Sequence, residues 1–485
     1  MEAITIPYVR IPSINIGGIC LPGIGAPGSI GKKGLIWPAG MKEHIKAWYD
    51  PKKQGLTNYD VIEAYVEDFT NWYKEINNGT VTATNKSFHF TEVKKIGSTN
   101  AIVRLVSHRI NGEIKLNIKG VTEDNPISFT EYSTTVLTVN KDGVYTLVIN
   151  DATVGIYFTK VGVVDVTVTQ LPTSILKDLS GNGNHAYLYG GKGKLNSGMG
   201  VYNEDFTTYT VQFDNNKPYE QYYNKVIIHN SDNYISNFWK NINEPPLGQT
   251  EYSGFKLKIS GLPKNSKVNI RVYYGDDYSQ IKTIEAITDE IVVIPKTTAN
   301  VITANKTFTY IDFNLTRYKN TITIEQIPDY PDQLCYDGKM YAVCYGFPIL
   351  TDYTVMAERK WFEKEEYSAF ISNSLGGMED PNNGAFSVEL KSLNSFTTIS
   401  FGSITSIGIP EKGITYQTKQ SYNGNSINVG TKESNDILIL GGRYFYKNDN
   451  AAGNTWNGCH GAIIVTDRSF TEEEINWLKQ NWDKI

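Results

Sequence analysis

The stretch 335–362, CYDGKMYAVCYGFPILTDYTVMAERKWF, decides the fold of this 485-residue chain. We read it as strand, turn, strand, loop and long strand, because Asp337 and Gly338 interrupt runs of aromatic and β-branched residues. Further short β runs follow it: FSVEL (386–390), TTISFGS (397–403), GITYQTK (413–419) and DILILGGRY (436–444). The C-terminal third is therefore predicted to be β structure built from short strands.

The end of the chain, GAIIVTDRSFTEEEINWLKQNW (461–482), joins a strand to a short helix. Thr471 is the expected N-cap, since Glu474 follows at the spacing of a capping box. Ile475, Leu478 and Trp482 then share one helical face. This pattern predicts a C-terminal helix packed on the β structure.

Two earlier segments add to the same domain, AWYDP (47–51) and DLSGNGNHAYLYG (178–190). The second begins with turn-forming residues and continues as a strand with period two. Oxygen atoms of Asp178, Asn182 and Asn184 are the kind that bind Ca²⁺. A turn in which Asp and Asn bond to nearby backbone groups explains these residues without a metal, and we assign no cofactor.

These four segments resemble concanavalin A/laminin-G-like (LamG) domains in structural proteins of Bacteroides bacteriophages, including crAss-like phages. The resemblance covers about half of the chain, and the segments around 335–362 and 461–482 match most specifically. It implies a jelly-roll β-sandwich formed by residues 47–60, 173–205 and 331–485. It also implies a virion structural protein, such as a capsid-attached head fibre, with the capsid or other virion proteins as partners.

Two long insertions, residues 61–172 and 206–330, separate these segments. IKLNIKG (114–120) resembles FKLKISG (255–261), and VTVTQLP (166–172) resembles ITIEQIP (322–328). The insertions are either copies of one β module or two unrelated β modules; NKSFHF (85–90) and NKTFTY (305–310) break the order of a simple repeat. The predicted fold is mainly β: a jelly-roll sandwich interrupted by two β modules, with Leu188 and Val355 in one core.

Residues 1–46 are predicted to form an extended attachment arm, because IPSINIGGICLPGIGAPGSIGKKG (11–34) has neither a helical nor a strand period. Its apolar side chains would be exposed unless they dock on a partner. These candidate partner-binding residues are Ile14, Ile16, Ile19, Leu21, Ile24 and Ile30. We expect a homo-oligomer, a trimer or a dimer; the alternative is an arm that wraps around its own chain.

Composition excludes several classes of partner. The formal net charge of −5 gives no broad basic surface, so we expect no nucleic acid. No stretch is apolar enough to insert into a membrane, and the start lacks an export signal. Four cysteines (Cys20, Cys335, Cys344 and Cys459) are too few for a disulfide framework. Cys335 and Cys344 either pair across a hairpin or remain buried thiols.

Catalytic motifs are absent from the sequence. The six histidines form no HEXXH motif, and neither GxSxG nor GxxxxGK[ST] occurs. Acidic residues cluster at 363–366, 379–380 and 472–474, without the alternation along a strand that a glycosidase site requires. Tyr341, Tyr345 and Trp456 are candidates for stacking on sugars, although core packing is commoner for tryptophan. We therefore predict no catalytic residues and a protein that is not an enzyme.

The sequence thus predicts a non-enzymatic structural protein located in the virion and made in the host cytoplasm. Two other functions remain open at this point. One is a glycan-binding receptor or adhesin of a phage tail, because the same fold class recognises sugars. Glycans on the host surface would then be its partners. The other is a polysaccharide-cleaving enzyme.

Overall fold

The structure is a computed structural model of the chain. It describes residues 14–16, 19–21, 35–55, 67–71, 74–75, 80–94, 102–105, 110–132, 134–189, 196–197, 206, 210–212, 219–222, 225–229, 237–240, 255–264, 267–274, 280–294, 310–314, 320–362, 366–375, 383–392, 395–408, 412–446 and 451–485. The predicted fold class is confirmed: these residues form antiparallel β-sheets, with α1 (Pro51–Gln54) and a C-terminal helix α2 (Glu472–Asn481). None of their helices is both long and apolar enough to cross a membrane.

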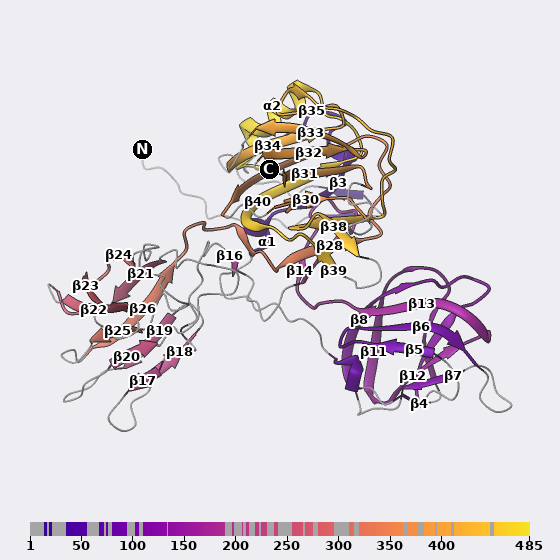
Figure 1. The fold of residues 1–485 in the computed structure, drawn as a ribbon, viewed down its shortest axis with the longest axis horizontal. Helices are drawn as coiled ribbons and strands as arrows, with labels where there is room; N and C mark the ends of the chain where they lie inside the picture. The colour runs from indigo at the N-terminus through magenta and orange to yellow at the C-terminus, as the bar shows by residue number, and fades with distance from the viewer. Residues whose placement is uncertain are drawn as a thin grey trace, which may run out of the picture. The chain divides into compact units, whose positions relative to one another are not determined.

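The first inserted module, strands β4 to β13, is a sandwich of two five-stranded sheets (Figure 1). One sheet runs in the spatial order β10 (Thr134–Val139), β9 (Ile127–Glu131), β12 (Val154–Phe158), β7 (Ile102–Leu105), β4 (Lys74–Glu75). The other runs β11 (Gly143–Ala152), β8 (Ile110–Lys119), β13 (Gly162–Gln170), β6 (Ser87–Val93), β5 (Thr80–Ala83). The period of two in β8 buries Ile114, Leu116 and Ile118 between the sheets.

The second inserted module, strands β17 to β26, also has two five-stranded sheets (Figure 1). One runs β17 (Thr210–Gln212), β20 (Asn237–Lys240), β25 (Tyr310–Asn314), β22 (Lys267–Tyr274), β23 (Gln280–Ile287). The other runs β18 (Tyr219–Gln221), β19 (Lys225–His229), β26 (Thr321–Ile327), β21 (Phe255–Ser260), β24 (Ile291–Ile294). Leu257 and Ile259 of β21 are fully buried, at the positions that match Leu116 and Ile118 of the first module.

The two modules have the same strand order. Numbering the ten strands of each module from its start, both have sheets in the order 1-4-9-6-7 and 2-3-10-5-8. The register agrees as well, since Val168 pairs with Ile118 and Ile324 pairs with Ile259. Ile118 and Ile259 are the fifth residues of IKLNIKG and FKLKISG, and Val168 and Ile324 are the third residues of VTVTQLP and ITIEQIP. The structure therefore favours copies of one module over unrelated insertions.

A glycine and a phenylalanine occupy equivalent positions in both modules. Gly120 (φ +84°) and Gly261 (φ +89°) end β8 and β21, and each lies against a backbone carbonyl of the neighbouring strand. The tetrapeptide EDFT occurs at 67–70 and again at 204–207, with Phe69 and Phe206 both buried. By contrast, NKSFHF leads into β6 and NKTFTY into β25, which are not equivalent strands, so that likeness is not part of the repeat.

The jelly-roll sandwich contains the remaining strands of the body (Figure 1). Its first sheet runs β14 (Ile175–Leu176), β15 (Ala186–Tyr189), β28 (Tyr341–Tyr345), β37 (Ile437–Leu440), β30 (Ile371–Ser372), β31 (Phe386–Ser392), β32 (Ser395–Ser400), β33 (Ser403–Gly408). Its second sheet runs β16 (Asn196–Ser197), β27 (Leu334–Asp337), β40 (Asn457–Thr466), β29 (Thr354–Trp361), β34 (Lys412–Thr418), β35 (Ser421–Tyr422), β36 (Asn425–Ser426). Strand β3 (Ile45–Tyr49) pairs with β40, and β38 (Tyr444–Tyr446) forms a hairpin with β39 (Ala451–Gly453).

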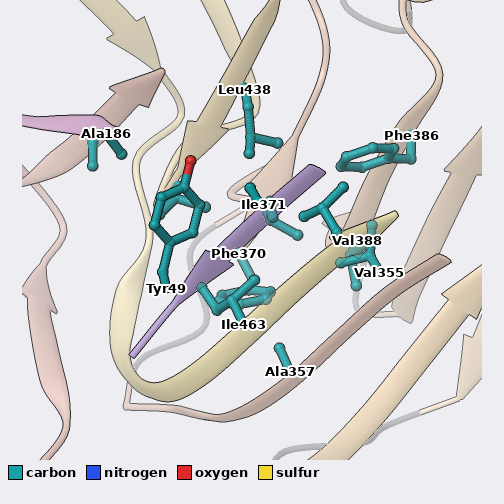
Figure 2. Close-up of a cluster of buried hydrophobic side chains, with 14 of the residues drawn as sticks. Tyr49, Ala186, Val355, Ala357, Phe370, Ile371, Phe386, Val388, Leu438 and Ile463 are labelled. Carbon is teal, nitrogen blue, oxygen red and sulfur yellow. The ribbon is translucent and has the colours of Figure 1, made fainter. Parts of the chain in front are cut away.

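One hydrophobic core joins segments that the insertions separate in the chain. Figure 2 shows Tyr49 of β3, Ala186 of β15 and Ile463 of β40 in the same cluster as residues of β29 to β31. Leu188 and Val355 belong to this core, at 0% and 2% exposure. Burial of these side chains holds the sandwich together across both insertions.

The C-terminal helix forms as its sequence predicts. Thr471 accepts a hydrogen bond from the Glu474 backbone and Glu474 accepts one from the Thr471 backbone, so the capping box is complete. Ile475 and Leu478 are buried. The ring of Trp477 lies 5.1 Å from that of Trp37, between centroids.

Candidate functional site

Four of the six apolar residues predicted to bind a partner lie in a β-hairpin. Strand β1 (Ile14–Ile16) pairs with β2 (Ile19–Leu21), with Ile14 opposite Leu21 and Ile16 opposite Ile19. These two short strands are the described part of residues 1–34 of the predicted attachment arm. The remaining two, Ile24 and Ile30, lie outside the described residues.

The candidate calcium-binding turn ties β3 to the jelly roll. Asp178 accepts hydrogen bonds from the backbone amides of Trp48 (2.9 Å), Ser180 (2.9 Å) and Asn184 (3.0 Å) and from the Ser180 hydroxyl (2.8 Å). Asn182 and Asn184 direct their amide groups to carbonyl oxygens of β3, each at 2.7 Å. Both oxygens of Asp178 therefore accept hydrogen bonds from protein donors.

Replacing Asp178 with alanine is expected to destabilise the jelly roll by about 2–4 kcal/mol, because buried donors of β3 and of the turn lose their acceptor. Urea unfolding followed by tryptophan fluorescence measures this loss. Asp332→Ala is the control, since the Asp332 side chain is 57% exposed and should change stability by less than about 0.5 kcal/mol. Equal effects of the two variants would refute the anchoring role of the turn.

The aromatic residues proposed to stack on sugars contact other aromatic side chains of the protein. Trp456 is fully buried, with Trp361 at 5.8 Å and Phe370 at 5.0 Å between ring centroids, so it cannot contact a sugar. Tyr341 is 9% exposed and stacks on another tyrosine ring at 5.1 Å. Tyr345 shares a hydrogen bond of 2.8 Å with Tyr189.

Cys335 and Cys344 are both buried free thiols, which is one of the two alternatives predicted from the sequence. Cys335 lies on β27 and Cys344 on β28, and these strands belong to opposite sheets of the sandwich, so the two form no hairpin pair. Cys344 is a free thiol in the hydrophobic core. Cys335 is instead directly opposite Cys459 of β40, on the outer face of the second sheet. Both thiols are free and at most 1% exposed.

A chain of polar contacts continues from this thiol pair. The Cys459 thiol donates to Gln333 Oε1 at 2.9 Å, and Gln333 Nε2 donates to Glu358 Oε1 at 3.2 Å. Lys360 Nζ lies 4.6 Å from the ring centroid of Tyr330 and donates to its hydroxyl. We call Cys335, Cys459, Gln333, Glu358 and Lys360 the thiol cluster. It is the one place among the described residues where two thiols, an amine and a carboxylate gather.

Burial decides the protonation state of this cluster. It raises the pKa of the Cys459 thiol well above its ordinary value, and the contact with Cys335 acts in the same direction. A protonated thiol is a poor nucleophile. The adjacent His460 cannot act as its base: its Nδ1–H donates to the Gly461 carbonyl, its Nε2 accepts from Tyr336 in the core, and burial lowers its pKa to about 4. The cluster is therefore not suited to nucleophilic attack on a substrate at neutral pH.

A buried ion pair lies between the two sheets of the jelly roll. Arg359 of β29 and Glu389 of β31 are both inaccessible, and Arg359 Nε donates to Glu389 at 2.5 Å. Trp361 Nε1 (3.0 Å) and the Tyr422 hydroxyl donate to the same carboxylate, while Arg359 Nη1 donates to the Gly413 carbonyl at 3.1 Å. Burial lowers the pKa of Arg359 to about 10, so it stays charged at neutral pH. The network links the sheets and has no opening for a substrate.

This ion pair was missed in the sequence. The signal was a charged residue inside each of two strand-like runs, FSVEL and TVMAERKW. Of the acidic clusters considered for glycosidase chemistry, Glu472 to Glu474 form the first turn of α2. Within the described ranges, no group of three or more His, Cys, Asp or Glu side chains is placed to hold a metal ion.

Comparison with known proteins does not assign the chain to a family. No family model and no curated protein matches the chain. Solved structures that match include Trypanosoma rangeli sialidase in complex with 2,3-difluoro-KDN (8% identity, 84% of each chain, TM-score 0.25) and with sialic acid (9% identity, 84% of each chain, TM-score 0.24). Another is the M60 catalytic domain with two CBM51 domains of Clostridium perfringens ZmpB (10% identity, 55% of this chain and 39% of that chain, TM-score 0.15).

These matches contradict the prediction that the chain is not an enzyme, because the sialidases are enzymes. At a TM-score of 0.25 or less, they assign no activity, substrate or catalytic residue to this chain.

Proposed function

We propose that this chain is a structural protein of a bacteriophage particle, an appendage attached through its N-terminal segment to the capsid or to another virion protein. The resemblance of the jelly-roll segments to phage LamG domains supports the proposal. So does the apolar composition of the N-terminal segment, in which β1 pairs with β2.

The observation that carries the proposal is the pair of equivalent modules inserted into the chain of a third sandwich. Two modules of the same fold in one chain allow two contacts with a partner, and two linked contacts strengthen binding through effective concentration. Strands β11 and β24 are the equivalent edge strands of the two modules. Exposed β-branched side chains lie on both, with Val148 at 52%, Ile291 at 57% and Val293 at 58% exposure. Such edges suit the addition of a partner strand, as in an assembled particle.

Cryo-electron microscopy of purified particles, combined with mass spectrometry of their proteins, tests this function. We expect the chain in particles at a fixed ratio to the major capsid protein, with density for three β-sandwiches on the head or tail. A protein that is abundant in the lysate and absent from purified particles would contradict the proposal.

Removing residues 1–40 is expected to leave a folded body that no longer enters particles. We also propose a dimer or trimer, whose mass by light scattering should fall towards that of the monomer when the segment is removed. Circular dichroism checks that the body keeps its β structure.

A full-length variant separates the effect of the apolar side chains from the effect of shortening the chain. Serine at positions 14, 16, 19 and 21 should reduce incorporation as strongly as the deletion. Serine at Asn15 and Cys20, the intervening positions of the same strands, should leave incorporation unchanged. Normal incorporation of the fourfold variant would rule out attachment through these four apolar residues.

A further inference from the structure

We propose that Cys335 and Cys459 are a site of oxidative modification, at which a disulfide forms across β27 and β40. The two residues are directly opposite in an antiparallel pair, between Leu334–His460 and Tyr336–Gly458. Nothing in this inference depends on the proposed function, although a protein made in a reducing cytoplasm and released from the cell would meet the necessary change of environment.

The hydrogen-bond pattern of the two strands shows that Cys335 and Cys459 form a non-hydrogen-bonded pair, the kind in which a disulfide can form. Residues opposite each other in an antiparallel ladder alternate between hydrogen-bonded and non-hydrogen-bonded pairs. The Gly338 amide donates to the Trp456 carbonyl at 3.1 Å, so the pair 338–456 is hydrogen-bonded. Cys335–Cys459 is three steps along the same ladder and is therefore a non-hydrogen-bonded pair.

Non-hydrogen-bonded pairs bring side chains closest. Their Cα atoms are about 4.5 Å apart, which lies within the range of about 4.4–6.8 Å that a disulfide spans. Bridging thus requires rotation of side chains and no movement of strands.

The reaction is a thiol–disulfide exchange with a small-molecule disulfide as the oxidant. One cysteine thiolate attacks the oxidant, forms a mixed disulfide and releases one reduced thiol. The second cysteine, once deprotonated, attacks the protein sulfur of the mixed disulfide and expels the other reduced thiol. Two protein thiols and one oxidant molecule thus give one protein disulfide and two reduced thiols. Because the Cys459 thiol is protonated at neutral pH, the exchange should accelerate as pH rises.

The bond has a structural consequence at the exit of the second inserted module. Strand β27 is where the chain re-enters the jelly roll after β26, and β40 is an inner strand of the same sheet. A disulfide closes the long loop between them and restricts the unfolded chain. Oxidation should therefore stabilise the jelly roll selectively.

The test is oxidation of the full-length protein by oxidised glutathione at pH 8.5, both in the folded state and during refolding from urea. Mass spectrometry of peptides cut without reduction identifies the linked cysteines. We expect Cys335 joined to Cys459, and a thermal midpoint raised by about 5–10 °C that returns to its starting value with dithiothreitol.

Matched serine variants complete the test. Cys335→Ser and Cys459→Ser should each abolish the shift, whereas Cys344→Ser, a buried thiol in the other sheet, should preserve it. Mixed glutathione disulfides on both cysteines, a link to Cys344, or unmodified thiols after oxidative refolding would each overturn the proposal. So would the same shift in the Cys335→Ser variant.

Discussion

Replacing Glu389 with glutamine is expected to destabilise the jelly-roll sandwich by about 3–5 kcal/mol, because Arg359 is left as a buried charge without its counter-ion. Arg359→Met should have a comparable effect by stranding Glu389. Both side chains are inaccessible to solvent, so water cannot replace the lost partner. Urea unfolding, monitored by tryptophan fluorescence, measures the change in the midpoint for the transition of the jelly roll.

The double variant Arg359→Met/Glu389→Leu distinguishes a coupled pair from two independent effects. Removing both charges should cost less than either single change, with a residual loss because the donors Trp361 and Tyr422 no longer have an acceptor. Glu358→Gln is the control, since Glu358 precedes Arg359 on β29 and is only partly buried; it should cost less than about 1 kcal/mol. Additive effects of the two charge removals would contradict a direct ion pair.

Gly120→Ala and Gly261→Ala are each expected to destabilise their own module by at least about 3 kcal/mol, through backbone strain and a backbone clash. A Cβ at position 120 would lie 1.8 Å from the Asp165 carbonyl oxygen, and one at position 261 would lie 2.1 Å from that of Thr321. Neither oxygen can move without shifting the neighbouring strand. Hydrogen exchange should show lost protection in β8 and β13 for the first variant, and in β21 and β26 for the second.

Gly55→Ala separates the clash from the effect of backbone conformation. Gly55 also has a positive φ of +69°, but an added Cβ there would meet nothing within 4 Å. It should cost only about 1–2 kcal/mol, the usual strain of a left-handed residue with a side chain. If Gly120→Ala and Gly55→Ala are equally stable, the close approach to Asp165 does not constrain the module. If only one of the two module variants is destabilised, the equivalence of the modules fails.

Features set by neighbouring residues could be predicted from the sequence. In IKLNIKG the apolar residues alternate with polar ones, and Ile114, Leu116 and Ile118 lie on the buried face of the strand. The spacing of Thr471 and Glu474 predicts a capping box for the same reason. The internal sequence likenesses suggested that one module is duplicated. The tetrapeptide EDFT at 67–70 and 204–207 is a further sign of the duplication that the sequence alone contains.

The contacts between segments far apart in the chain could be determined only from the tertiary structure. The sequence offered only Cys344, which is close along the chain, as a disulfide partner for Cys335, with free thiols as the alternative, whereas the sheets place Cys335 opposite Cys459. Likewise, FSVEL and TVMAERKW are ordinary strand sequences until a sandwich brings Glu389 to Arg359. Local patterns determine which residues point inward, because backbone geometry repeats every two residues in a strand. Which inward side chain meets which depends on strand order and register, and these are set by the packing of the whole sandwich.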